Sequence, residues 1–213
     1  MLSWLTPWLT PRAYGQRFVT LYSISDDNPI GLAQVNGVLY GATFAYGGSG
    51  YNCSTVFELQ PPAIKGGPWV GMTLYAFPNI PGAACSLSGA PVVGADGSLY
   101  GIASGGAYLG GAIYRVQPPV SPGGAWTESV LYNFGAPGTQ LGTPATIVSG
   151  PNGSYYILGQ SAGANGEGAL DLLQPPASPA GTWSATVLYS FATFDLPNSL
   201  VARPDGVLYV TAP

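Results

Sequence analysis

The chain contains no histidine among its 213 residues, although histidine is the most versatile general base and metal ligand in proteins. Ser-His-Asp and Cys-His catalysis therefore lack their base, and two cysteines alone cannot form a structural zinc site. No GxxxxGK[ST] phosphate loop occurs, and the Gly-rich stretches lie between predicted strands instead of opening a helix. The sequence thus predicts no cofactor, no metal and no catalytic residue belonging to a familiar motif.

Nine carboxylates remain as candidate acids and bases. Asp96 and Asp205 are explained as turn residues, and Glu58 and Glu128 fall within predicted strands, where they fit solvated faces. The unexplained acids are Asp26, Asp27, Glu167, Asp171 and Asp195. All but Asp171 fall in loops expected at one end of the fold. A ring of acids there could bind a cation or cleave a glycosidic bond, whereas isolated loop acids more often serve solubility alone.

Three tyrosines, Tyr46, Tyr51 and Tyr108, lie in Gly-rich loops. An amphipathic ring on such a loop can stack on a sugar or on a side chain of a partner protein. Rings folded down onto the body of the protein are an equally good interpretation. Most other tyrosines recur at equivalent positions and are interpreted as packing.

The two cysteines fall in loops that the predicted topology brings to the same end. Cys53 lies between the second and third strands of one unit, and Cys85 lies in the connection to the next unit. A disulfide between them is sterically reasonable and would fit an oxidising compartment, while two unrelated free thiols remain the alternative.

The composition excludes some classes of partner. With a net charge of −4 and only five basic residues, the chain lacks the basic surface that nucleic acids require. No apolar run approaches the roughly 18 residues of a transmembrane helix. The apolar start MLSWLTPWLT lacks the basic region of a signal peptide and is interpreted as mature structure. Low charge with abundant Tyr, Gly, Asn, Ser and Thr favours an extracellular or cell-surface location.

An internal repeat of about 57 residues organises the chain. The Leu-Tyr pair recurs at Leu21, Leu74, Leu131 and Leu188. Gln-Pro-Pro recurs at Gln60, Gln117 and Gln174, and a tryptophan recurs at Trp69, Trp126 and Trp183. Three independent landmarks in one register establish the period.

Each unit is predicted to contain four short antiparallel strands. The turn pairs Asn36-Gly37, Asp96-Gly97, Asn152-Gly153 and Asp205-Gly206 predict type I′ hairpins between the first two strands. A third strand ends at Gln-Pro-Pro, because proline lacks a ladder donor, and a fourth runs from the tryptophan through Leu-Tyr.

Four-stranded repeats predict an all-β protein, a four-bladed β-propeller forming a single domain over 1–213. The blades are expected at 29–77, 88–134, 144–191, and 198–213 combined with 1–24. Pairing of the N- and C-terminal strands would close the last blade. A fragment of a longer repeat array is the alternative.

The unit resembles the bacterial tandem repeat called GloVer, found in choice-of-anchor proteins. The matching residues are Leu39 to Thr43, Gly47-Gly48, Thr55 to Leu59, Trp69 and Leu74 to Phe77. The resemblance covers nearly the whole chain and weakens in the third unit, where Ile157 replaces a glycine and Asp171 an aromatic residue. It implies export and frequent surface attachment, and it implies no activity. This sequence departs from the family pattern in its small number of repeats, and we expect no C-terminal anchor of the family's kind.

We expect an exported, non-enzymatic binding or scaffold module that meets a glycan or a surface protein at its loop-rich face. A carboxylate-based enzyme acting on carbohydrate is the competing class, and a structural protein that self-assembles through its blade edges is the third.

Overall fold

The computed structural model describes residues 19–24, 28–44, 53–80, 85–136, 142–161, 163–178, 180–192 and 197–212. Within these ranges the protein is all-β, apart from a single turn of 3-10 helix, η1 (Pro151–Gly153). No helix in this part of the chain is long and apolar enough to cross a membrane.

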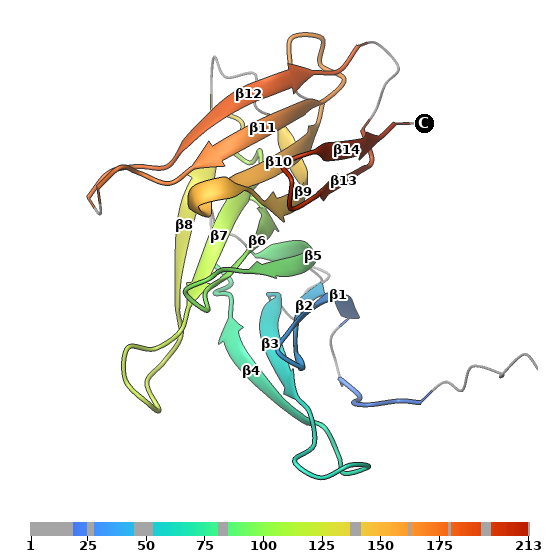
Figure 1. Ribbon diagram of the computed structural model, residues 1–213. Coiled ribbons are helices and arrows are strands. Elements are labelled where there is room, and N and C mark those ends of the chain that lie inside the picture. The colour runs from blue at the N-terminus through green and yellow to red at the C-terminus, as the bar shows by residue number, and fades with distance from the viewer. Residues whose placement is uncertain are drawn as a thin grey trace, which may run out of the picture.

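Three antiparallel sheets of four strands each follow one another along the chain, and a two-stranded sheet comes after them (Figure 1). The first sheet contains β1 (Asn28–Val35), β2 (Val38–Phe44), β3 (Thr55–Gln60) and β4 (Val70–Ala76). The second contains β5 (Ser86–Val93), β6 (Leu99–Ser104), β7 (Ala112–Gln117) and β8 (Thr127–Asn133). The third contains β9 (Thr143–Ser149), β10 (Tyr155–Gln160), β11 (Ala169–Gln174) and β12 (Ser184–Ser190). The last pairs β13 (Ser199–Ala202) with β14 (Leu208–Thr211). The predicted repeat is thereby confirmed, while closure into a propeller is not shown.

All four predicted hairpins between first and second strands are present, but their turns are of two kinds. Asn36 and Asn152 adopt positive φ, and the glycine after each does so too, as a type I′ turn requires. At Asp96-Gly97 and Asp205-Gly206 only the glycine has positive φ. The prediction of type I′ turns was therefore wrong for these two units. There the aspartate carboxylate accepts a hydrogen bond from the backbone N–H two residues later, as in an Asx turn.

The recurrent Leu-Tyr pair marks a β-bulge in the fourth strand. Tyr75 pairs with Val56, but Thr73 pairs with Phe57, so that Leu74 is an extra residue on β4. The same shift occurs at Leu131 in β8 and at Leu188 in β12. Residues two apart on a regular strand point to the same face of the sheet. Because of the extra residue, Thr73 and Tyr75 point to opposite faces.

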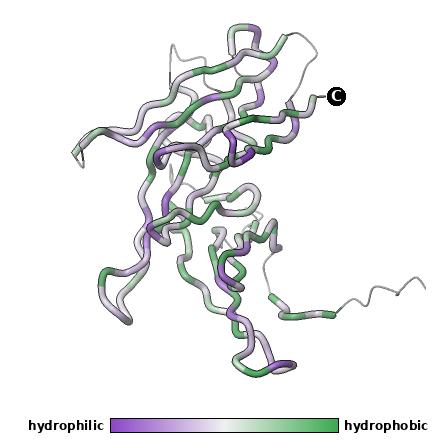
Figure 2. The backbone as a smooth tube through the Cα atoms, in the orientation of Figure 1, coloured by the Kyte–Doolittle hydropathy of each residue, from purple (hydrophilic) through white to green (hydrophobic). Residues whose placement is uncertain are grey.

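The hydrophobic cores lie between successive sheets. Val56 and Phe77 of the first sheet pack with Leu99 and Tyr114 of the second. A second core joins the second and third sheets, and a third joins the third sheet to the last hairpin. Figure 2 shows hydrophobic stretches distributed over all the sheets. Each sheet is thus stabilised by its neighbours, as expected of a repeat that cannot bury its faces alone.

The first strands of successive sheets meet at the inside of this arrangement. Strand β5 contacts both β1 and β9, and β13 contacts β9, whereas β4, β8 and β12 lie outermost (Figure 1). The ends at which β5, β9 and β13 begin therefore converge on one region of the molecule.

Candidate functional site

Of the seven residues that the sequence singled out for binding, the structure describes Tyr108 and Glu167. Tyr108 is 52% exposed in the loop between β6 and β7, and Glu167 is half-buried in the corresponding loop of the third sheet. The other candidates, Tyr46, Tyr51, Asp26, Asp27 and Asp195, lie outside the described residues.

The predicted disulfide between Cys53 and Cys85 is confirmed, and it joins the first sheet to the beginning of the second. The two Cα atoms are 5.0 Å apart. Beside the bridge, the N–H of Ser54 donates to the carbonyl of Cys85 at 3.0 Å, and the buried Ser54 hydroxyl accepts from the N–H of Leu87 at 3.1 Å. The loop between second and third strands is thereby held against the next inner strand.

The junction between the second and third sheets and the junction between the third sheet and the last hairpin have the same layout. In each, the loop after the second strand lies against the next first strand, without a disulfide. A Cβ placed on Gly111 would lie 2.8 Å from Cδ of Pro144, and one on Gly168 would lie 2.6 Å from Cδ of Pro197. Glycine is needed at both positions because each loop runs directly against the proline before or within the next inner strand. All three junctions lie at the end of the molecule where the inner strands begin.

An open cavity of about 510 Å³ lies at this same end. Its wall includes the beginnings of β5 and β9, the ends of β6 and β10, the loop after β6, and the residue that precedes β13. Its polar lining residues are Ser88, Ser104, Thr143, Gln160 and Asn198. The larger apolar ones are Ile102, Leu109 and Pro144.

The described side chains that line this cavity are uncharged. Hydroxyl groups and side-chain amides both donate and accept hydrogen bonds, and the aliphatic side chains add apolar surface. None of the described residues that line the cavity carries a charge. Such a surface suits a ligand rich in hydroxyl groups with an apolar face, and its described residues include no carboxylate for acid–base chemistry.

Leu109 at the rim of the cavity has a conformation that sequence reasoning missed. Its φ is 60°, in the left-handed region that leucine rarely adopts, and its side chain is 83% exposed. The residue 57 positions later, Gly166, occupies the same place in the third unit and has a φ of 75°. In both loops the N–H of this residue bonds to the carbonyl of a glycine three positions earlier. A glycine would therefore suit position 109, so the exposed leucine is retained there against a local backbone cost.

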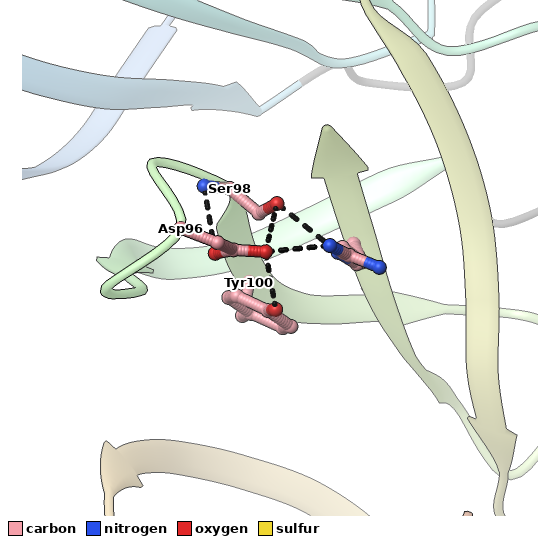
Figure 3. Close-up of polar contacts among 4 residues, drawn as sticks. Asp96, Ser98 and Tyr100 are labelled. Carbon is pink, nitrogen blue, oxygen red and sulfur yellow. Dashed lines mark hydrogen bonds and ion pairs between the residues drawn. The ribbon is translucent and has the colours of Figure 1, made fainter. Parts of the chain in front are cut away.

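A second polar cluster lies at the opposite end, around the hairpin turn between β5 and β6 (Figure 3). Nη2 of Arg115 lies 2.5 Å from Oδ2 of Asp96, and the Arg115 Nε donates to the Ser98 hydroxyl at 3.1 Å. Both the hydroxyl and the backbone N–H of Ser98 donate to the Asp96 carboxylate, and the Tyr100 hydroxyl lies 3.4 Å from it. Burial acts to raise the pKa of Asp96, but the hydrogen bonds from Ser98 and Arg115 outweigh it and leave the pKa below its usual value. Because these groups satisfy one another, the cluster fixes the turn, in agreement with the interpretation of Asp96 as a turn residue.

One acid differs from what the sequence suggested, and another is one that the sequence left unexplained. Glu128 was expected on a solvated face, yet its Oε1 is shielded from solvent and has no hydrogen-bond partner, and burial raises its pKa. Glu128 interacts with Tyr75 of the first sheet. Burial, and then the negative charge of Glu128, raise the pKa of Tyr75. Asp171, the one unexplained acid not placed in a loop, is completely buried in β11.

Comparisons with known proteins leave the family open. No protein-family model matches the chain, and no curated protein matches it. A solved structure described as a bifunctional GH43-CE protein of Bacteroides eggerthii is similar at 21% sequence identity and a TM-score of 0.46. The similarity covers 84% of this chain and 21% of that one, so the chain spans about a fifth of its length. The resemblance to the GloVer repeat stays a prediction.

Proposed function

We propose that this protein is a non-enzymatic binding module whose cavity at the loop-rich face takes an uncharged, hydroxyl-rich ligand, namely a carbohydrate. The observation that carries the proposal is Leu109, which lines the cavity and is preceded in the same loop by Tyr108. Both side chains are exposed, and Leu109 is kept in a conformation that costs backbone energy. Exposed apolar groups beside neutral hydrogen-bonding residues match the apolar faces and hydroxyls of a sugar.

The competing proposal, a carboxylate-based enzyme, has less support. Glycosidases need two carboxyl groups facing each other across the substrate. Among the described acids none lines the cavity, and Glu167, the described member of the predicted ring of acids, lies outside its lining. A structural, self-assembling protein is the third proposal, and its supporting feature is the two-stranded β13–β14 sheet, in which β14 pairs with β13 alone among the described strands.

We propose further that the four units close into a ring, with the N-terminal segment completing the last blade. The support comes from residues 19–24, which lie over the first sheet. A Cβ on Gly71 would lie 2.5 Å from Cζ of Tyr22, so the tyrosine ring rests on that position. The equivalent residues of the next unit, Tyr75 and Glu128, also meet. Tyr22 and Tyr75 are equivalent residues of the repeat. Tyr22 thus contacts the first sheet at the position equivalent to the one at which Tyr75 contacts the second sheet.

Export to an oxidising compartment is proposed together with this function, and the disulfide supports it. A glycan or a glycosylated surface protein is the proposed partner.

Replacement of Leu109 by glycine tests the binding proposal. The wild type and the variant Leu109→Gly are screened against a panel of immobilised glycans, and the affinity for any glycan retained is measured by calorimetry. We expect at least a tenfold loss of affinity, because an apolar contact at the rim is removed. Stability should stay equal or rise slightly, because glycine adopts the local φ without strain.

Val120→Ser provides the matched control, because Val120 is fully exposed on the β7–β8 hairpin at the other end of the molecule. It should bind as the wild type does. If binding survives in Leu109→Gly but is lost in Val120→Ser, the ligand binds outside the cavity. If the protein turns over a glycan, the proposal of a carboxylate-based enzyme is favoured.

A further inference from the structure

Asp171 is a completely buried carboxyl group without a hydrogen-bond partner. Its exposed fraction is 0%, and neither Oδ1 nor Oδ2 contacts a donor. An unpaired buried carboxylate is costly because the charge loses its water without compensation. A group of this kind in a protein core calls for a specific explanation.

The repeat shows what occupies the same place in the other sheets. Phe57 lies opposite Gly41, and Tyr114 lies opposite Gly101, each ring lying directly over its glycine. In the third sheet Asp171 lies opposite Ile157. The third sheet thus has an isoleucine in place of the glycine and an acid in place of the aromatic ring.

The surroundings of Asp171 belong to the seam between the second and third sheets. Its neighbours in the sheet, Ile157 on β10 and Val187 on β12, are apolar and belong to the core that joins these two sheets. Across the seam, the titratable group that faces it is Tyr132 of β8, whose pKa is raised by burial and by the negative charge of Asp171. Burial raises the pKa of Asp171 itself to about 7.

We propose that Asp171 makes the seam between the second and third sheets sensitive to pH, so that the seam is tightly packed with a neutral carboxyl group and loosens when that group ionises. A protonated carboxyl is a small polar group that the apolar seam tolerates. The carboxylate needs water, and Tyr132 of β8 faces it across the seam, so we expect hydration to move β8 away from β11. The ionised state therefore favours a hydrated, less closely packed seam.

The same seam shapes the candidate binding cavity, and this second step rests on the proposed function. Ile102 belongs both to the core of the seam and to the cavity wall. The wall is built from the second sheet on one side and from Thr143, Pro144 and Gln160 of the third on the other. Loosening of the seam changes the spacing of the two walls, so ligand affinity should fall as Asp171 ionises.

The direction of the pH effect follows from proton linkage. The folded protein holds the Asp171 proton up to about pH 7, whereas the unfolded chain releases it near pH 4. The contribution of this group to stability is therefore complete below pH 4 and is lost as the pH rises towards 7. The unfolding equilibrium constant should increase about tenfold per pH unit over this range, about a thousandfold in all.

The test compares chemical unfolding of the wild type and Asp171→Asn between pH 4 and 8.5. The difference between their unfolding constants should follow the predicted change, because all other titrating groups, Glu128 included, are shared. A double variant, Ile157→Gly with Asp171→Tyr, restores the pair found in the second sheet and should lose the same pH dependence. Hydrogen exchange of amides in β8 and β11 should accelerate with pH in the wild type more than in either variant.

Parallel pH dependence of the wild type and both variants would overturn the proposal. A titration of the Asp171 side-chain carboxyl followed by carbon NMR needs no variant, and a midpoint near pH 4 would overturn it equally. These readouts require no ligand, so they stand apart from a failure to find a glycan. If a glycan is found, affinity that is constant between pH 5 and 8 would refute only the coupling to the cavity.

Discussion

Individual side chains in this protein depart from the repeat at two positions for which we propose a role other than packing. Leu109 stands where the third unit has a glycine, and Asp171 stands where the other units have aromatic rings. The replacement at Asp171 was visible in the sequence, but its burial was not, because burial depends on which sheets pack together. Leu109 was missed altogether, since nothing in the letters alone shows that position 109 needs a positive φ.

The ion pair between Arg115 and Asp96 is expected to make a small contribution to stability. Arg115→Met should lower the free energy of unfolding by about 1 kcal/mol, because the pair is partly exposed and supported by hydrogen bonds from Ser98. Arg203→Met is the matched control, as the pair of Arg203 with Asp205 is about half exposed and should contribute less. Urea unfolding at pH 7 measures both.

The pH dependence of this effect has the opposite sign to that of Asp171. Because the pKa of Asp96 is lowered in the folded protein, the contribution of the pair is present above about pH 4 and is lost as the pH falls below that value. The difference between Arg115→Met and the wild type should therefore shrink at pH 3. An unchanged difference at pH 3 would show that packing of the Arg115 stem, and not its charge, accounts for the effect.

The positions of strands and turns were largely predictable from the sequence, because the residues that end a strand or form a turn act on their own stretch of backbone. Gln-Pro-Pro ends each third strand. In each of the four hairpin turns, the Asn or Asp is followed by a glycine that has positive φ. The sequence did not distinguish the two kinds of turn, since an aspartate that accepts a hydrogen bond from the backbone N–H two residues later competes with the type I′ geometry. The bulge at each Leu-Tyr pair was not predicted either, because a register shift depends on the partner strand.

The disulfide fixes the junction between the first two sheets and should stabilise the fold. Replacing Cys53 and Cys85 by serine together should lower the free energy of unfolding by about 3 kcal/mol, as the bond closes a loop across a sequence separation of 32. Thermal unfolding with and without dithiothreitol measures the effect. The reductant should lower the melting temperature of the wild type and leave that of the double variant unchanged. Two free thiols in the unreduced native protein would contradict this account.

In the molecule as a whole, equivalent tyrosines are more exposed near the C-terminal end of the repeat than in its second unit. Tyr189 and Tyr209 are 56% and 54% exposed, whereas their equivalents in the second unit, Tyr132 and Tyr100, are half-buried and buried. The exposed tyrosines belong to the side on which the last sheet has, among the described residues, the two strands β13 and β14. The period of the sequence predicted four units, but it could not establish closure, since that depends on contacts between the two ends of the chain.

The proposal that the four units close into a ring is tested most directly by the thermal stability of the chain lacking residues 1–11. If the ring is closed, this chain unfolds at a much lower temperature than the intact protein. A synthetic peptide of residues 1–11 added in trans should restore stability, while a peptide of the same composition in scrambled order should not. A shortened chain that melts at the same temperature as the intact protein would contradict the closed ring.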